Sequence, residues 1–416
     1  LTLAPLTSGS WHTVNLTFLF GDNMILKTLG TAMLAAGLLT SAVVAQAETV
    51  RWARSADVTT LDPHVFNTGT NFVLMHQMYE TLLNRTADGK LQPLLATEWK
   101  LLPNDATVWE FKIRPNVKFH DGKPLTAKDV VFSLNRAKGP NAQVKSLLAS
   151  VDTITAVDDL TVHVKTKGPN PIFPNNLTNI FIMNEAWAKA NGALETQDAT
   201  SKTENGATRA VNGTGAFTLA TREVDSRTVM KQNPNYWGKA KVGDVTELVY
   251  LPIKSPATRV AALLSGEVDF AQDIPAQDVA RLKQDAKLRI NEGPENRSIF
   301  LGLNVGSPEL KSSNVKGKNP LADPKVRQAM ELAIDRDAIK RSVMRGLSNP
   351  SGVMAPSFVN GYEKAMAAYP KADGNKAKAL LSEAGYPSGF TSTLHTPNDR
   401  YVNDEAISTA YVGMLG

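Results

Sequence analysis

The chain has 416 residues, of which 42% are hydrophobic and 20% are charged, as in an ordinary folded protein. This composition excludes a largely disordered, collagen-like or polytopic membrane protein, and the length predicts two or three lobes because single cores stop growing at about 300 residues. The net charge of +5, without a basic run, does not favour nucleic acid as a partner. The lack of cysteine excludes disulfides, thiolate metal sites, cysteine nucleophiles and a lipid-anchoring cysteine.

Residues 24–47 have the pattern of a secretory signal peptide. Lys27 precedes an uncharged stretch that ends in the Ala-x-Ala arrangement of residues 45–47, so cleavage is expected before Glu48. A membrane anchor is the alternative, because about 20 uncharged residues can span a bilayer. Interruptions by Gly, Thr and Ser and the lack of a following basic flank favour cleavage. Residues 1–23 are interpreted as an upstream extension with no fold of its own.

After residue 48 the pattern predicts alternating strands and helices. Predicted strands lie at 49–54, 108–114, 151–156, 160–166, 216–221, 226–231, 245–253, 268–274, 288–293 and 298–305. Predicted helices lie at 71–83, 126–137, 255–266, 275–284, 323–334, 335–346, 374–385 and 399–416. The polar stretch 189–210 is expected to be a solvated loop. This order predicts an α+β first lobe, followed by strand–helix alternation typical of an α/β lobe with a mostly parallel sheet.

The sequence carries no established catalytic signature. The six histidines are scattered, and no pair has metal-ligand spacing on a helix, so neither a metal nor a cofactor is expected. Nucleophile-elbow, Walker and dinucleotide-binding patterns do not occur. A secreted two-lobe chain without catalytic signatures favours capture of a ligand between lobes that close by hinge motion, with no catalytic residue.

Several longer motifs narrow this interpretation. The block from Trp109 to Val130 contains the pattern FHDG-x-P-x-T-A-x-DV, and five further motifs occur around it. These are Leu61–His64, Asn212–Phe217, Asn233–Trp237, Leu264–Asp269 and Asp323–Ala329. Together they resemble the family 5 extracellular solute-binding proteins, the peptide- and nickel-type receptors of ABC importers. The resemblance runs from about Glu48 to the last residue, with the motifs in family order.

The resemblance implies an α/β fold of the two-lobe periplasmic binding protein type, class II or cluster C, with a hinge and an interlobe cleft. The first lobe is expected at 48–295, with a subdomain at about 85–200, and the second lobe at 296–416. Hinge crossings are expected near Gly213–Gly215 and near 298–305. The chain stops on a predicted amphipathic helix, whereas family members continue, so the second lobe is expected to be incomplete at its C-terminus. The part beyond would hold the acidic residue that grips a peptide's amino group in relatives.

Ligand contacts are expected from two segments. Phe66, Asn67, Thr68, Gly69 and Thr70 match the loop that lines the cleft in relatives, and Asn296 and Arg297 are candidates for pairing with a ligand terminus.

The other motifs have structural interpretations that need no ligand. His120 and Asp121 are interpreted as turn and packing residues. Asn235–Trp237 is expected to be aromatic packing at a strand end, and Gly213–Gly215 a flexible crossing between lobes. Glu267 and Asp269 are interpreted as surface charges, or alternatively as residues that face the importer.

The resemblance implies a periplasmic substrate-binding component of an ABC importer, present as a monomer, that delivers a di- or oligopeptide to an inner-membrane permease. A nickel chelate, glutathione, an opine or an oligosaccharide are alternative solutes, because one scaffold carries many ligands. A secreted hydrolase and a chaperone-like envelope protein are further alternatives. The signal peptide without a lipid-anchoring cysteine predicts a location in the periplasm.

Overall fold

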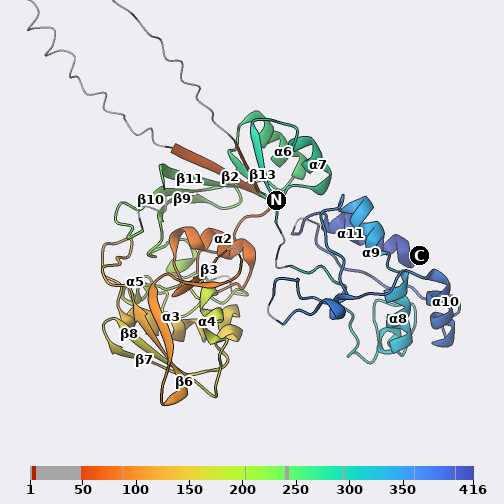
Figure 1. The fold of residues 1–416 in the computed structure, drawn as a ribbon, viewed down its shortest axis with the longest axis horizontal. Coiled ribbons are helices and arrows are strands. Elements are labelled where there is room, and N and C mark those ends of the chain that lie inside the picture. Colours follow the sequence, from red (N-terminus) through yellow and green to blue (C-terminus); the bar gives the residue numbers. More distant parts are fainter. Residues whose placement is uncertain are drawn as a thin grey trace, which may run out of the picture.

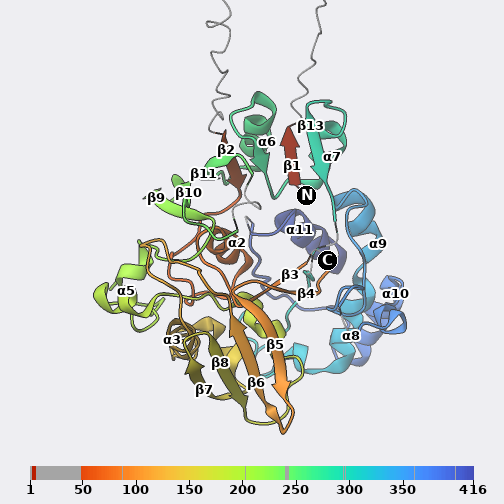
Figure 2. The ribbon, with the colours of Figure 1, turned by 60° about the vertical axis from the view of Figure 1, so that its left-hand side comes forward.

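The protein is described here from a computed structural model. The described residues are 2–5, 48–86, 88–201, 203–238, 243–293, 295, 297–359, 361–398 and 400–416. They form two lobes that lie side by side, and the chain passes from the first to the second after β13 (Leu288–Asn291) (Figures 1 and 2). Among these residues, no helix has the length and apolarity needed to cross a membrane. The predicted signal peptide at 24–47 lies outside the described residues.

The first lobe is built around a mixed sheet with the strand order β13-β1-β12-β2-β11-β10-β9. The bounds are β1 Thr2–Pro5, β2 Glu48–Arg54, β9 Phe217–Glu223, β10 Arg227–Gln232, β11 Val245–Pro252 and β12 Phe270–Ala271. β2 pairs in parallel with both β11 and β12, and helices α6 (Pro256–Ser265) and α7 (Ala276–Leu282) follow those two strands. The carboxyl ends of three parallel strands therefore meet at one edge of the sheet.

β1 differs from the sequence-based expectation. Thr2–Pro5 pair in antiparallel fashion with β12 and β13, with Leu3 opposite Ala271 and Ile290. The expectation that residues 1–23 have no fold is therefore wrong for these four residues. Residues 6–47 lie outside the described part of the chain.

A second sheet forms the subdomain at the lower end of the first lobe in Figure 1. Its order is β5-β6-β8-β7, with β5 Ala96–Leu102, β6 Asp105–Ile113, β7 Val151–Asp158 and β8 Thr161–Thr166. The paired strands β3 (Leu83–Arg85) and β4 (Leu91–Pro93) lie before it, and three helices accompany it: α3 Ala127–Ala137, α4 Phe173–Asn176 and α5 Glu185–Ala190. α3 is amphipathic and packs its apolar face against β7 and β8, which is why Val130 and Leu134 share a core with Val162 and Val164. The strands predicted at 108–114, 151–156 and 160–166 are confirmed.

Two of the motifs, Asn212–Phe217 and Asn233–Trp237, meet at a buried carboxylate, that of Glu80. Its Oε2 accepts hydrogen bonds from Thr214 Oγ1 at 2.8 Å and Trp237 Nε1 at 2.9 Å, and its Oε1 accepts one from Tyr236 Oη at 3.0 Å. Burial raises the pKa of Glu80, while these donors and the nearby Arg114 oppose the rise. The network explains why helix α2 (Gly69–Met78) ends before the predicted 83, because Glu80 must leave the helix to reach its partners.

The segment Gly213–Gly215 lies inside the first lobe, so the prediction of a flexible crossing between lobes there is wrong. Gly215 N donates to Met78 O at 2.9 Å, and Gly213 O accepts from His120 N at 2.8 Å. A Cβ atom at Gly213 would lie 2.1 Å from Met78 O, and one at Gly215 would lie 2.6 Å from Met78 C. The glycines therefore serve close backbone packing.

The motif Leu61–His64 is likewise held by a buried network. Both carboxylate oxygens of Asp62 accept from Arg136, at 2.8 and 2.6 Å, and both side chains are fully buried. His64 Nε2 lies 2.9 Å from Phe181 O, and burial lowers the pKa of His64 to about 4, so this ring is neutral at physiological pH.

The described part of the second lobe is helical. It contains α8 Pro324–Ala333, α9 Arg336–Ala338, α10 Gly374–Glu383 and α11 Asp404–Leu415, with a π-helical turn at Ile339–Val343 after α9. α8 and α10 share an apolar cluster that includes Val326 and Leu381. Short 3-10 helices elsewhere are Gln143–Leu148, Leu177–Asn179, Gly206–Thr208, Pro320–Ala322 and Lys364–Ala367.

The predicted strand at 298–305 is wrong, because this segment has no regular structure. Phe300 is 66% exposed and Ile299 50% exposed, and no strand of the described residues pairs with them. The mostly parallel sheet expected for the second half is present only where β11 and β12 pair with β2. The described residues from 297 onward contain no strand.

Substitution Gly213→Ala should destabilise the first lobe by about 3 kcal/mol, because the new methyl group would overlap a backbone carbonyl that has no room to move. Gly168→Ala is the matched control, since a Cβ atom there has no neighbour within 4 Å. Scanning calorimetry of both variants measures the effect. Equal melting temperatures for the two would contradict the packing assigned to Gly213.

Candidate functional site

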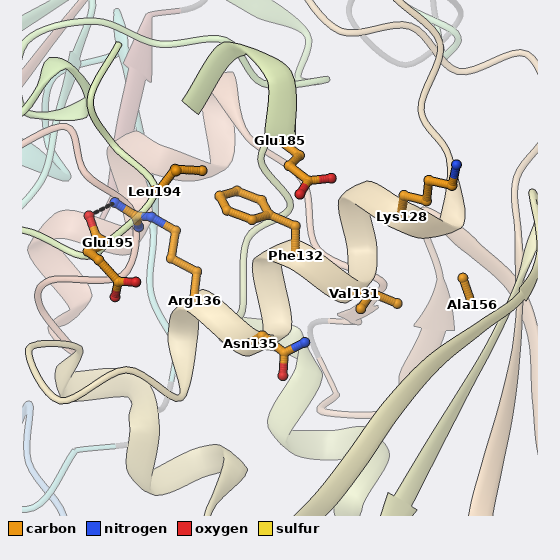
Figure 3. A pocket seen from close by; sticks show the side chains of 9 residues that line it. All are labelled: Lys128, Val131, Phe132, Asn135, Arg136, Ala156, Glu185, Leu194 and Glu195. Carbon is orange, nitrogen blue, oxygen red and sulfur yellow. Dashed lines mark hydrogen bonds between the residues drawn. The ribbon is translucent and has the colours of Figure 1, made fainter. Parts of the chain in front are cut away.

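One hollow of about 510 Å³ lies entirely within the subdomain of the first lobe (Figure 3). Its lining consists of Lys128, Val131, Phe132, Asn135, Arg136, Ala156, Glu185, Leu194 and Glu195. Figure 3 shows Phe132 of α3 pointing toward α5 and Leu194, with Lys128 and Ala156 at the opposite end. Arg136 is already paired with Asp62 and with the backbone oxygens of Ala193 and Glu195. This groove belongs to one lobe only.

A second hollow of about 580 Å³ is lined by residues of both lobes. The first lobe contributes Ser55, Lys254, Pro256, Arg259, Asp273, Pro275 and Gln277, and the second contributes Asn398, Tyr401, Val402, Asn403, Asp404, Glu405, Ala406, Thr409 and Ala410. We call it the interlobe cavity. It lies where the parallel strands β2, β11 and β12 end, which is the edge at which α/β sheets bind ligands.

Asp273 organises the first-lobe wall of the interlobe cavity. Its carboxylate accepts two hydrogen bonds from the guanidinium of Arg54, at 3.1 and 3.2 Å. It accepts two more from Ser55 N and Oγ, each at 3.2 Å. Burial alone would raise the pKa of Asp273, but the hydrogen bonds and charge of Arg54 outweigh it and hold that pKa below its ordinary value. The carboxylate therefore stays ionised at neutral pH.

Arg259 of α6 belongs to the same wall. Its guanidinium donates to the backbone oxygens of Ile253, Gln272 and Asp273, the residues just after β11 and β12. Burial lowers the pKa of Arg259. Nε, Nη1 and Nη2 of Arg259 each donate to a backbone oxygen, so Arg259 holds the ends of β11 and β12 in place.

The second-lobe wall is the N-terminal part of α11 and the turn before it. Asp404 Oδ2 accepts from the backbone nitrogens of Arg400 and Tyr401, at 3.1 and 3.0 Å, and Oδ1 accepts from Glu405 N. Asn403 takes the left-handed conformation at φ 57° and donates from Nδ2 to Val343 O at 2.9 Å. These bonds fix the turn and leave Glu405, Ala406, Thr409 and Ala410 facing the cavity.

The structure places Arg297 beside the interlobe cavity, one layer behind its lining. The guanidinium carbon lies 4.9 Å from the centre of the Tyr401 ring, and Nη2 pairs with Glu295 at 2.8 Å. Tyr401 itself lines the cavity. Arg297 therefore supports a cavity residue, and a direct ligand contact from it stays a prediction. Asn296 lies outside the described residues.

The predicted contact loop Phe66–Thr70 lies at the start of α2 and lines neither hollow. Thr68 is the N-cap residue, with its Oγ1 3.2 Å from Asn71 Oδ1, and Asn67 N donates weakly to Gln143 Oε1 at 3.4 Å. Asn67 and Gly69 are exposed, whereas Phe66, Thr68 and Thr70 are half-buried. Their contact with a ligand stays a prediction.

His120 and Asp121 form a turn with Gly122, as the sequence predicted. His120 Nδ1 accepts from Gly213 N at 3.3 Å, and Asp121 N donates to Asn212 Oδ1 at 3.1 Å. Burial lowers the pKa of His120 to about 4, so the ring is neutral and holds the turn against Gly213–Gly215.

Sequence reasoning missed most of the cavity lining. Asp273 was included in a predicted strand, and Tyr401 and Asn403 in a predicted helix, with no signal that they face each other. Only the rule that ligands bind at the carboxyl ends of parallel strands could have indicated Ser55 and Asp273.

Comparison with known proteins identifies the family. A family model described as "Bacterial extracellular solute-binding proteins, family 5 Middle" matches residues 90–416. The chain belongs to this family. It is 30% identical over 380 residues to the glutathione-binding protein GsiB of Pectobacterium atrosepticum, covering 89% of this chain and 68% of the relative. It is 27% identical over 392 residues to the periplasmic oligopeptide-binding protein OppA of Escherichia coli K12, covering 88% and 68%.

Solved structures agree with this assignment. The protein AgaA from A. tumefaciens R10, in complex with agropinic acid, is 29% identical with a TM-score of 0.69, covering 88% of this chain and 70% of that one. DppA of Helicobacter pylori with the peptide STSA is 25% identical with a TM-score of 0.72, covering 89% and 72%. The prediction of a two-lobe periplasmic binding protein fold is confirmed. The chain spans about two thirds of the length of the curated relatives.

Substitution Asp273→Asn tests the first-lobe wall, because asparagine also tolerates the left-handed backbone at this position, φ 57°. Losing the charge should cost about 2 kcal/mol of unfolding free energy at pH 7, since Arg54 is left buried without its partner. Because the folded pKa of Asp273 is lowered, its contribution is present above about pH 4 and is lost as the pH falls through the folded pKa.

Urea unfolding of the two proteins at pH 7 and at pH 3 measures the difference, which should shrink at pH 3. Asp278→Asn is the control, since Asp278 pairs with Arg281 on the surface of α7. A gap between the unchanged protein and Asp273→Asn that is as large at pH 3 as at pH 7 would rule out the ion pair as its cause.

Proposed function

We propose that this protein is the substrate-binding component of an ABC importer and holds a small peptide in the interlobe cavity. The supporting observation is that one cavity of about 580 Å³ takes its walls from both lobes. This volume lies within the range of small-molecule sites, about 300 to 1,000 Å³. The relatives named above are binding proteins and not enzymes, which confirms the prediction of a protein without catalytic activity.

The cavity lining favours a solute with several polar groups. Asn398, Asn403 and Gln277 offer amide donors and acceptors, and charged side chains of both signs lie on the two walls. Peptides present alternating backbone donors and acceptors that suit such a lining. Tyr401 adds an aromatic side chain to the lining, and the guanidinium carbons of Arg297 and Arg400 lie 4.9 and 5.3 Å from the centre of its ring.

Similar proteins support a peptide without fixing which one. Relatives are named for glutathione, which is a tripeptide, and for oligopeptides, and a neighbouring structure holds the peptide STSA. Because the AgaA structure holds agropinic acid, an opine is the second candidate for the solute. The structures with nickel–histidine complexes that match at 21% and 18% identity support the fold alone.

We further propose that the protein acts as a monomer in the periplasm and presents the loaded form to a membrane permease. A ligand that contacts both walls stabilises the arrangement in which the lobes are close. The ligand shifts the population from separated lobes to close lobes only to the extent that it binds the close arrangement more tightly than the separated one. The permease would then recognise the joint surface of two closed lobes.

Isothermal titration calorimetry with di- to tetrapeptides, glutathione and agropinic acid tests the proposal. Saturable binding of at least one peptide to a single site, with the peptide recovered unchanged by mass spectrometry, is the expected result. Hydrolysis of the peptide, or binding of agropinic acid with no peptide binding, would contradict it.

Substitution Ala410→Trp tests the place of binding. Ala410 faces the interlobe cavity from α11, and an indole group there would fill part of its volume, so the affinity for the peptide should fall at least tenfold. Ala379→Trp on the exposed face of α10 is the matched control and should bind like the unchanged protein. Unchanged affinity in the Ala410→Trp variant would place the peptide elsewhere.

A further inference from the structure

Leu347 of the second lobe packs against an apolar cluster of the first lobe. This first-lobe cluster includes Ala53 of β2, Ile274 after β12, Leu263 of α6 and Val279 of α7. Figures 1 and 2 show α9, which precedes Leu347 in the chain, on the side of the second lobe that faces α7 and β13. Leu347 is half-buried and does not line the interlobe cavity. The two lobes therefore have an apolar contact outside the cavity.

A tight turn presents Leu347 to the first lobe. Leu347 N donates to Met344 O at 2.8 Å, and Gly346 N donates at 2.8 Å to the oxygen of Lys340 in the π-helical turn. The two central residues of the tight turn, Arg345 and Gly346, are left-handed, with φ of 51° and 85°. A turn with positive φ at both central positions is accessible to few sequences. The backbone before Leu347 is thus held by its own hydrogen bonds.

The same turn is connected to the second-lobe wall of the interlobe cavity. Val343, directly before Met344, accepts through its backbone oxygen from Asn403 Nδ2 at 2.9 Å. Asn403 lines the cavity in the turn before α11. One hydrogen bond therefore joins the second-lobe wall to the segment that carries Leu347.

The first-lobe cluster is connected to the opposite wall in a comparable way. Ala53 directly precedes Arg54, and Ile274 directly follows Asp273, the two residues whose ion pair holds the first-lobe wall. Ala53 and Ile274 are both fully buried in the cluster. The contact of Leu347 with this cluster thus links the two walls from behind.

We infer that Leu347 is a positioning residue that sets the spacing between the two walls of the interlobe cavity. Its apolar contact holds the second lobe against the first lobe without any solute. With a polar side chain at this position the contact loses its stabilisation, and the lobes separate more often. The inference goes beyond the proposed function, and its test needs no solute, so either can fail without the other.

The distance between the lobes in the free protein tests the inference. Because the chain has no cysteine, Asp159→Cys after β7 and Lys378→Cys on α10 add two exposed sites that alone take spin labels. Pulsed electron spin resonance should give a narrow distance distribution for the labelled protein. Leu347→Ser should at least double the width of that distribution and add longer distances. Leu347→Met keeps the apolar volume and should leave the distribution narrow.

Leu415→Ser is the matched control, since Leu415 is 41% exposed on α11 and does not pack against the first-lobe cluster. A second pair of variants tests the turn. Arg345→Gly accepts the left-handed backbone and should keep the distribution narrow, whereas Arg345→Val opposes it and should broaden the distribution as Leu347→Ser does. Circular dichroism checks that each variant is folded. A narrow distribution in both Leu347→Ser and Arg345→Val, or equal broadening in Leu415→Ser, would overturn the inference.

Discussion

The pairing of Asp273 with Arg54 is the interaction on which the interlobe cavity depends. It joins the residues that follow β12 to the end of β2. Arg259 donates to the backbone oxygens of Ile253 and Asp273, and so also connects the end of β11 to the end of β12. The ends of the three parallel strands are thereby held together as one surface. The backbone oxygens that follow β11 and β12, which the sheet leaves unpaired, accept hydrogen bonds from Arg259. A helix of the second lobe faces this surface, with its own turn held by Asp404. Hydrogen bonds within each wall therefore hold the lining of the cavity in place.

Four of the six motifs that resemble the family take part in buried hydrogen-bond networks of the first lobe and do not line the interlobe cavity. Leu61–His64 is held by Asp62 and Arg136, and three other motifs meet at Glu80 and at the turn around His120. These networks are buried in the first lobe, and each connects segments more than 50 residues apart in sequence. A scaffold of this kind leaves the cavity lining free to differ, which agrees with relatives named for glutathione, oligopeptides and agropinic acid on one fold.

The elements with strong local patterns could be predicted from the sequence. Helix α3 has both a capping box at Thr126 and an apolar face, and strands β6 and β8 alternate clearly. The strand expected at 298–305 failed because alternation alone cannot supply a partner strand. The hinge expected at Gly213–Gly215 failed because glycine permits close packing as readily as flexibility. The cavity could not be predicted, because Asp273 and Tyr401 are brought together by the docking of two lobes and not by any local pattern.

The central claim, that a solute is captured between the two lobes, is tested most directly by hydrogen exchange mass spectrometry with and without the best-binding peptide. The account predicts slower exchange on binding at 54–57, 254–259 and 273–277 of the first lobe and at 398–410 of the second, with no change around the groove at 128–136 and 185–195. Protection confined to one lobe, or centred on that groove, would contradict it.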